Sequence, residues 1–143
     1  MTGTISSYLL HRGTMNFPEE FHDLLSAGAR VYLYLATSMP DGSPQVTPVW
    51  FDMEGDLIRI NTNEGRIKDK NMKVRPSVAL VIQDPADPYR YLGVCGEVVE
   101  HTTEGADEHI NQLSLKYDHK PWTWRPGQKR IIYKIRALHF DRH

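Results

Sequence analysis

The sequence predicts a mainly β domain, an antiparallel barrel or sandwich with two or three peripheral helices. Five or six apolar or alternating runs have the length and β-branched content of strands, and turn residues separate them. Strong amphipathic helical spacing occurs over residues 104–118, and a shorter example over residues 18–27. Strands and helices do not alternate regularly, which argues against a doubly wound parallel sheet and favours strands in meander order.

Size and composition limit the possible classes of protein. The 143 residues form one domain with room for a core, and a net charge of −1 argues against a nucleic-acid partner. No apolar run approaches the roughly 20 residues that cross a bilayer, so we expect no membrane insertion. Residues 1–16 contain no signal-peptide core. Cys95 is the single cysteine, which excludes an internal disulfide and makes a reducing cytoplasm the expected location.

The N-terminal part is predicted to be an arm and a helix. Residues 1–16 lack sustained periodicity, so we expect a loosely held arm before one domain over residues 17–143. A helix is predicted over residues 18–27, since Pro18 suits the first helical position and Gly28 is a plausible stop.

Three strands follow in the predicted order. Residues 31–37 form a continuous apolar and aromatic run, which predicts a strand buried on both faces. A Pro- and Gly-containing turn leads to a second strand over residues 45–53. The Glu-Gly-Asp turn at 54–56 then closes a hairpin onto a strand at residues 57–62.

The second half continues with strands around two helices. A short basic helix is expected from residue 66. Gly93 and Gly96 lie inside the long fifth strand, which predicts a bulge or the close approach of another group. The remaining elements are strands at 78–82, 89–101 and 129–140 and a helix at 104–118.

The stretch of residues 62–71 carries the strongest functional signal. It follows a strand and opens a helix, and residues 66–75 hold five Lys or Arg against one Asp. Backbone N–H groups at a helix start, together with cationic side chains, are what a bound phosphate needs. No Gly-rich cradle is present, so a single phosphomonoester or diester is favoured over a polyphosphate. The alternative is a solvated basic helix face.

Other chemistry finds little support in the sequence. The seven histidines show no metal-binding spacing, so no metal site is predicted, and no nucleophile elbow is present. We therefore assign no catalytic residue and expect a cofactor to carry any reaction. Trp50 is expected to pack in the core, with ligand contact as the alternative. Trp122 and Trp124 fit either a pocket lid or a subunit contact.

Several motifs resemble the pyridoxamine 5′-phosphate oxidase-like superfamily, in the right order from about residue 17 to residue 140. They are DGSPQVTPVWF (41–51), NTNEGRIKDKN (61–71), RPSVAL (75–80) and DPADPYRYL (84–92). The members they resemble most are the short coenzyme F420-dependent reductases, which are flavin or deazaflavin oxidoreductases.

This resemblance implies an antiparallel split β-barrel of the FMN-binding type, which forms a homodimer with the cofactor at the subunit interface. The matching lysine, Lys68, would hold the cofactor phosphate with Arg66 nearby. The positions that correspond to cofactor contacts are Gln45, Thr47, Pro48, Val49, Asn61, Thr62, Arg66 and Lys68. Pyridoxamine oxidases place an arginine where this chain has Ile67, and basic residues where it has Gln45 and Trp50. These departures argue against pyridoxamine phosphate oxidase activity.

The implied reaction is hydride transfer from reduced F420 to a conjugated small-molecule acceptor. One alternative is an FMN-binding oxidoreductase that uses the same pocket. Another is a non-catalytic protein that binds a flavin, a deazaflavin or a tetrapyrrole. Lys70, Lys73 and Arg75 are available for the acidic tail of F420, and the loops at 84–90 and 119–127 would determine the acceptor.

Overall fold

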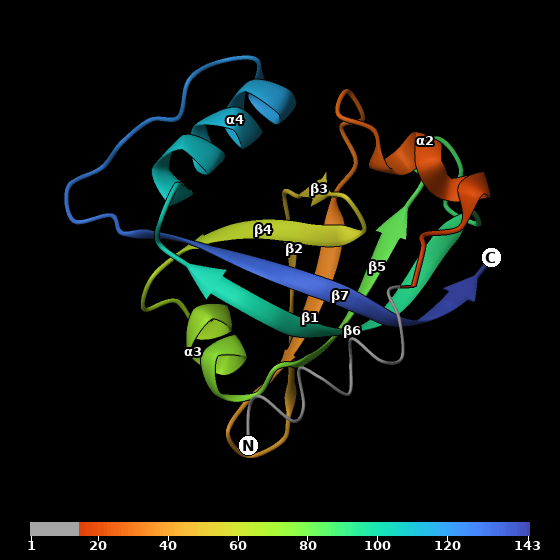
Figure 1. Cartoon of the computed structure of the whole chain (residues 1–143), viewed down its shortest axis with the longest axis horizontal. Coiled ribbons are helices and arrows are strands. Elements are labelled where there is room, and N and C mark those ends of the chain that lie inside the picture. The colour runs from red at the N-terminus through yellow and green to blue at the C-terminus, as the bar shows by residue number, and fades with distance from the viewer. Residues whose placement is uncertain (1–14) are drawn as a thin grey trace.

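The computed structural model describes residues 15–143, which form one seven-stranded antiparallel sheet with peripheral helices (Figure 1). The strand order is β2-β1-β5-β6-β7-β4-β3. The strands are β1 (Leu33–Ser38), β2 (Pro44–Val49), β3 (Asp52–Glu54), β4 (Leu57–Asn63), β5 (Ser77–Gln83), β6 (Tyr91–Thr102) and β7 (Arg130–Arg142). The helices are η1 (Glu19–Phe21), α2 (His22–Leu25), α3 (Ile67–Val74) and α4 (Ala106–Asp118). The predicted N-terminal arm lies outside the described residues except for its last two.

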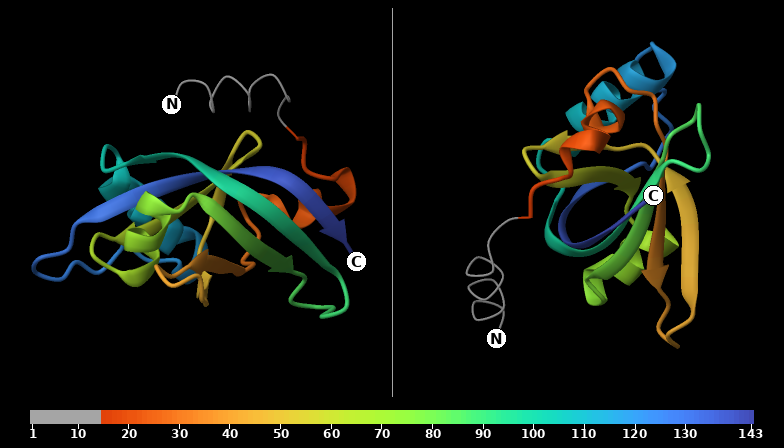
Figure 2. Two further views of the ribbon diagram at one scale, coloured as in Figure 1. Left: turned by 90° about the horizontal axis from the view of Figure 1, so that it is seen from below. Right: turned by 90° about the vertical axis from the view of Figure 1, so that its right-hand side faces the viewer.

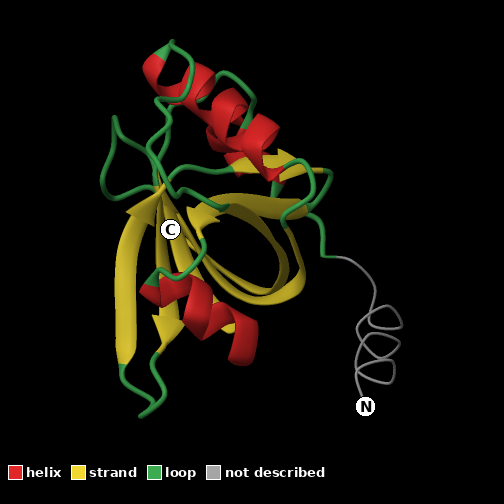
Figure 3. Ribbon diagram, turned by 90° about the vertical axis from the view of Figure 1, so that its left-hand side faces the viewer, coloured by secondary structure: helices red, strands yellow, loops and turns green. Residues whose placement is uncertain are grey.

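The sheet curls into a split barrel, as the sequence resemblance implied. Its two edge strands, β2 and β3, are consecutive in the chain and are joined by Trp50 and Phe51. Two strands at opposite ends of the hydrogen-bonded order can be so joined only if the sheet bends round on itself. Figures 2 and 3 show this curled sheet, with α4 on its outside. Met72 of α3 packs into the core inside the sheet. The prediction of a mainly β antiparallel fold is confirmed.

Two features of the strand order differ from the prediction. The order is not a simple meander, since β1 pairs with β5 and β4 with β7. The predicted strand at 45–53 is interrupted at Phe51, because side chains of α4 form hydrogen bonds with the backbone of that residue. The Phe51 N–H donates to the Tyr117 hydroxyl (3.3 Å), and the Phe51 carbonyl accepts from Lys116 Nζ (2.9 Å). One predicted strand therefore becomes β2 and β3.

The predicted burial of the first strand on both faces is wrong. Leu33 and Leu35 are fully buried, whereas Tyr32 and Tyr34 on the opposite face are exposed. Among the described residues, no second layer covers that face. The first helix is also shorter than predicted: it begins with the 3₁₀ turn η1 and ends at Leu25.

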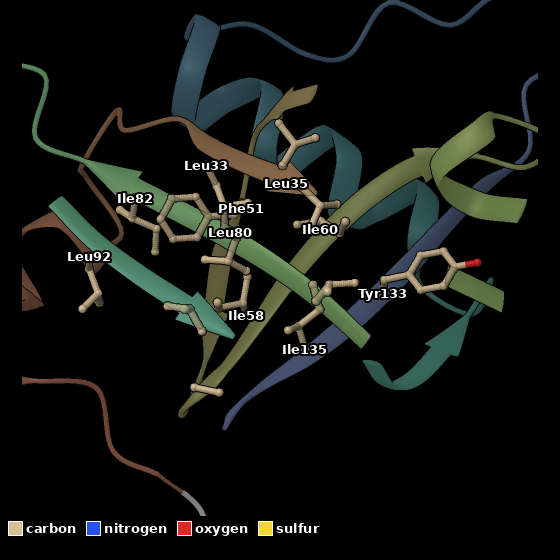
Figure 4. Packing of buried hydrophobic residues seen from close by; sticks show 14 of the residues in the cluster. Leu33, Leu35, Phe51, Ile58, Ile60, Leu80, Ile82, Leu92, Tyr133 and Ile135 are labelled. Carbon is tan, nitrogen blue, oxygen red and sulfur yellow. The ribbon is translucent and has the colours of Figure 1, made fainter. Parts of the chain in front are cut away.

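The main core fills the inside of the curled sheet. Figure 4 shows side chains from β1, β4, β5, β6 and β7 converging there, together with Phe51. A smaller apolar cluster lies under α4, where Ile110, Leu113 and Tyr117 pack with Trp50 and Trp122. These two clusters hold α4 and the end of β4 in place beside each other.

Gly96 lies where β6 and β7 pack closely. The sequence predicted a bulge or a close approach at this position, and the structure has both. The register shifts between Cys95 and Gly96, which marks a bulge. A Cβ at Gly96 would lie 2.9 Å from the Arg136 carbonyl oxygen and 2.9 Å from Ile135 Cγ2. At Gly93, by contrast, the nearest atom would lie at an ordinary 3.4 Å.

Gly96→Ala should therefore destabilise the protein by about 1 to 3 kcal/mol, because backbone atoms of β7 must move to admit the methyl group. Gly93→Ala is the matched control and should change the free energy of unfolding by less than about 0.5 kcal/mol. Urea denaturation of both variants beside the wild type measures the difference. Equal stability of the two variants would contradict this account of the bulge.

Candidate functional site

A cavity of about 520 Å³ lies between the end of β4, the start of α3, the helix α4 and the loop at 119–129. Its wall contains five basic side chains and one acidic side chain. The wall residues are Pro48, Val49, Trp50, Asn61, Thr62, Asn63, Arg66, Lys68, Ile110, Leu113, Ser114, Asp118, Lys120, Trp122, Thr123, Arg125, Gln128 and Arg130.

A buried carboxylate, that of Asp69, holds the turn between β4 and α3 in place. Asp69 accepts hydrogen bonds from the Gly65 N–H (2.8 Å) and from the Tyr133 hydroxyl (2.6 Å). Burial, and then the bond to Asp69, raises the pKa of Tyr133 well above its ordinary value. Gly65 has a φ of +94°, a backbone conformation that glycine adopts without strain. These contacts fix the direction in which Arg66 and Lys68 leave the helix start.

The starts of α3 and β7 are tied together by the pairing of β4 with β7. Asn63 pairs with Arg130 in the register, and Asn63 Oδ1 accepts from the Lys129 N–H (2.8 Å). The Lys129 carbonyl in turn accepts from the Glu64 N–H (2.8 Å). This reciprocal pair brings Arg130 to the same end of β4 as Lys68, although 62 positions separate them in the sequence.

Lys68, Arg130 and Arg66 form a cationic cluster at this end of the cavity. Lys68 and Arg130 are each 9 % exposed, and Arg130 Nε donates to Asn61 Oδ1 (2.8 Å). Burial lowers the pKa of Lys68, and the charges of Arg66 and Arg130 lower it further. Burial and Arg66 also lower the pKa of Arg130 to about 10.

No carboxylate forms an ion pair with this cluster among residues 15–143. None of the five basic side chains of the cavity wall forms an ion pair there. Buried charges are normally paired because desolvation penalises the charged form. Two buried cations, Lys68 and Arg130, with the exposed Arg66 beside them and no ion-pair partner, form an arrangement typical of anion-binding sites.

Aromatic side chains also line the cavity. Trp50 stacks on Tyr117 with ring centroids 5.2 Å apart, and Trp122 meets Trp50 edge-on at 6.0 Å. The Arg130 guanidinium lies 5.1 Å from the centre of the Trp122 ring, within cation–π distance. Trp122 is anchored by its N–H to Asn111 Oδ1 (2.9 Å) and by Nε1 to Gln128 Oε1 (3.0 Å). The cavity thus combines a cationic end with the aromatic side chains of Trp50 and Trp122.

Six of the eight residues predicted to contact a cofactor line this cavity: Pro48, Val49, Asn61, Thr62, Arg66 and Lys68. Thr62 follows Ile58 and Ile60 on the core side of β4, and its buried Oγ1 has no partner among the described residues. Gln45 and Thr47 lie elsewhere on β2. Gln45 Oε1 accepts from Thr37 (3.1 Å), and the buried hydroxyl of Thr47 has no partner within the described chain. Their contact with a cofactor stays a prediction.

Three further basic residues line the cavity but were not predicted as site residues from the sequence: Arg130, Lys120 and Arg125. The sequence shows that these residues are basic, but no local pattern predicts that the start of β7 and the 119–129 loop lie close to the end of β4. Trp122 lines the cavity, as one of its two predicted roles required, whereas Trp124 is half-exposed and outside it.

The three basic residues proposed for an acidic tail lie outside the cavity wall. Lys73 lies 3.4 Å from Asp69, and Arg75 binds the Ser38 carbonyl (2.7 Å) and Asn71 (3.0 Å). Lys70 is exposed. Within residues 15–143 there is no cluster of three side chains that could hold a metal ion. No helix there is long and apolar enough to cross a membrane.

A curled antiparallel sheet with a cavity lined by basic side chains at the end of β4 places the molecule among the split β-barrels, and the chain belongs to the pyridoxamine 5′-phosphate oxidase family. Residues 17–140 match the model of that family. No functionally curated protein matches the sequence.

The solved structures that resemble this chain differ in how similar their sequences are to it. A protein named F420 reductase is 35 % identical, with a TM-score of 0.78 over 89 % of this chain and 100 % of its own. A conserved hypothetical protein from Mycobacterium tuberculosis is 22 % identical (TM-score 0.65, 90 % of this chain and 86 % of its own). HupZ of Group A Streptococcus is 17 % identical (TM-score 0.64, 87 % and 91 %). The last two share the fold alone.

Replacing Lys68 with methionine should stabilise the ligand-free protein. Because the pKa of Lys68 is lowered on folding, the folded state binds this proton more weakly than the unfolded chain, and the ammonium opposes folding at neutral pH. Lys68→Met should raise Tm by about 2 to 5 °C at pH 7. The difference in Tm should shrink as the pH rises towards the pKa of free lysine.

Thermal unfolding by circular dichroism at several pH values measures this effect. Lys70→Met is the matched control, since Lys70 is exposed on the same helix. A lower Tm for Lys68→Met than for the wild type would show that the ammonium stabilises the ligand-free fold.

Proposed function

We propose that this protein is a reductase that binds reduced coenzyme F420 and transfers a hydride to a conjugated small-molecule acceptor. The observation that carries the proposal is the cluster of Lys68, Arg66 and Arg130, which has no carboxylate partner in the described chain and lies beside an aromatic wall. The 35 % identity to a protein named F420 reductase supports it.

The cavity fits a ligand that has a phosphate, a planar ring and further negative charge. Lys68 and Arg130 would hold the phosphate, with Arg66 at the rim. The unpartnered hydroxyl of Thr62 would gain a hydrogen-bond partner at the same end, which recovers the free energy lost by burying it alone. Lys120 and Arg125, on the loop at 119–129, would bind the acidic tail of F420.

When bound, the reduced deazaflavin supplies the hydride, and the protein supplies binding and orientation. Val49 and Trp50 would exclude water from one face of the ring, which strengthens the electrostatic contacts of the cations. Holding the phosphate at a fixed point on β4 and α3 sets the position of the ring relative to the acceptor. No residue of this chain is assigned to proton transfer.

An FMN-dependent oxidoreductase is the second candidate, because FMN shares a three-ring system and a phosphate with F420. The two additional cations of the 119–129 loop favour F420, since FMN has no charged tail for them to bind. A non-catalytic carrier of a flavin, deazaflavin or tetrapyrrole would use the same cavity without turnover.

Titration with F420 and with FMN, followed by fluorescence, tests the cofactor. We expect F420 to bind more tightly than FMN, and Lys68→Ala to weaken F420 binding by about 10- to 100-fold because a charge-assisted contact to the phosphate is lost. Lys70→Ala, on the exposed face of α3, should leave the affinity unchanged. Preferential binding of FMN would support the second candidate, and binding of neither would exclude both.

Turnover separates an enzyme from a carrier. An enzyme should oxidise reduced F420 in the presence of quinone, enone or biliverdin acceptors, followed by absorbance of the cofactor. A carrier should bind the cofactor without oxidising it.

We also propose that the protein is a homodimer with the cavity near its interface. The outer faces of β1 and β2 expose apolar side chains: Tyr34 is 41 % and Val46 is 64 % exposed. Tyr34 pairs with Pro48 across the two strands, and Pro48 also lines the cavity. The exposed apolar face therefore continues to the cavity edge, where a second subunit would complete the wall.

Val46→Asp should convert the dimer to monomers at micromolar concentration, because it buries a charge in an apolar interface. Sedimentation velocity measures the association state. Tyr89→Asp is the control at a position 86 % exposed on another loop, and it should remain dimeric. A monomeric wild type would contradict the proposal.

A further inference from the structure

His109 is a buried side chain that no part of the proposed binding site uses directly. It lies on α4, is 2 % exposed, and connects the cavity to a carboxylate on β3. Its Nδ1 lies 3.1 Å from Asn61 Nδ2, and its Nε2 lies 3.0 Å from Asp52 Oδ1. On the cavity side, Asn61 Oδ1 accepts from Arg130 Nε (2.8 Å). A continuous chain of hydrogen bonds therefore runs from Arg130 to Asp52.

The partners of Asn61 determine which of its amide atoms faces the histidine. Arg130 can only donate, so the amide oxygen must face the guanidinium. The Ala106 carbonyl can only accept, and it lies 2.9 Å from the amide nitrogen on the other side. The same nitrogen faces His109, and an amide NH₂ can only donate.

These constraints fix the proton of the imidazole. Because Asn61 donates to Nδ1, that ring nitrogen must be unprotonated, and the ring proton must lie on Nε2, where it donates to Asp52. Asp52 also accepts two bonds from Arg59, at 2.9 Å and 2.7 Å, which hold the carboxylate in place. The histidine is thus neutral in one defined tautomer.

We propose that neutral His109 is a positioning residue for the anion-binding end of the cavity. By accepting from Asn61 it holds the amide so that its oxygen faces Arg130 Nε. That bond turns the remaining guanidinium nitrogens, which have no hydrogen bond within residues 15–143, towards the cavity. This inference rests on the proposed function, in which Arg130 binds the cofactor phosphate.

Protonation of His109 would put two donors, the Asn61 amide and Nδ1–H, against each other at 3.1 Å. Turning the amide over would instead direct its NH₂ at Arg130, so neither orientation satisfies all groups. A charged imidazole is therefore incompatible with the orientation of Asn61 that the other contacts require. His109 also lines a second, smaller cavity, whose charged side chains are Glu54, Arg59, Glu104, Glu108 and Lys134.

The first test needs no cofactor. ¹⁵N NMR of the wild type at pH 7 should show His109 with an unprotonated Nδ1 and a protonated Nε2, and the Arg130 Nε–H should exchange slowly with solvent. In His109→Ala that exchange should become fast. A protonated Nδ1 or a charged ring at pH 7 would overturn the proposal, whether or not F420 binds.

The second test measures F420 affinity by fluorescence. His109→Ala should weaken binding by about 10-fold, the loss expected for one hydrogen bond at a charged site. His109→Gln keeps one acceptor and one donor and should restore affinity to within about 3-fold of the wild type. His101→Gln, at an exposed histidine on β6, should behave like the wild type throughout.

Equal affinities for His109→Ala and His109→Gln would overturn the positioning role. If His109→Ala does not fold, the affinity of His109→Gln relative to the wild type and the NMR tautomer still decide the question. Failure of the wild type to bind F420 or FMN would reject the proposed function without changing the NMR result.

Discussion

The pairing of β4 with β7 is the constraint on which the rest of the molecule depends. Seven consecutive residue pairs, from Leu57 with Arg136 to Asn63 with Arg130, set the register. A slip of one residue would turn Tyr133 and Ile135 out of the core and Arg130 away from Asn61. The same register brings the Tyr133 hydroxyl to Asp69, which holds the turn before α3. Core packing and cavity chemistry are therefore specified by one set of backbone hydrogen bonds.

The cavity concentrates positive charge at a cost to the folded state. Desolvation and mutual repulsion lower the pKa values of Lys68 and Arg130, so both cations are held where they are less stable than in water. An anion that enters the cavity removes this penalty, so binding and folding are linked. The surrounding structure is correspondingly well anchored: Asp69 of α3 accepts from the Gly65 N–H, and the Trp122 N–H, in the loop at 119–129, donates to Asn111.

Proximity to α4 distinguishes the two sides of β4. Ile58 and Ile60 face the barrel core, whereas Asn61 faces α4 and joins the polar chain through His109. Apolar packing inside the barrel thus holds β4 in place, and the polar side chains of the site lie between β4 and α4. The fold is shared with structures that are only 17 % and 22 % identical, so the fold alone does not determine what the cavity binds.

The sequence by itself determined the elements and part of the site. Strand periodicity, turn residues and the helical stripe of residues 104–118 depend on local chemistry, so they were readable without a structure. The motif at 61–71 located Lys68 and Arg66 for the same reason. Only the tertiary structure decided that Phe51 interrupts a strand, that β1 is buried on one face, and that Arg130 joins Lys68. Each of these depends on contacts between residues far apart in the chain, which no local pattern encodes.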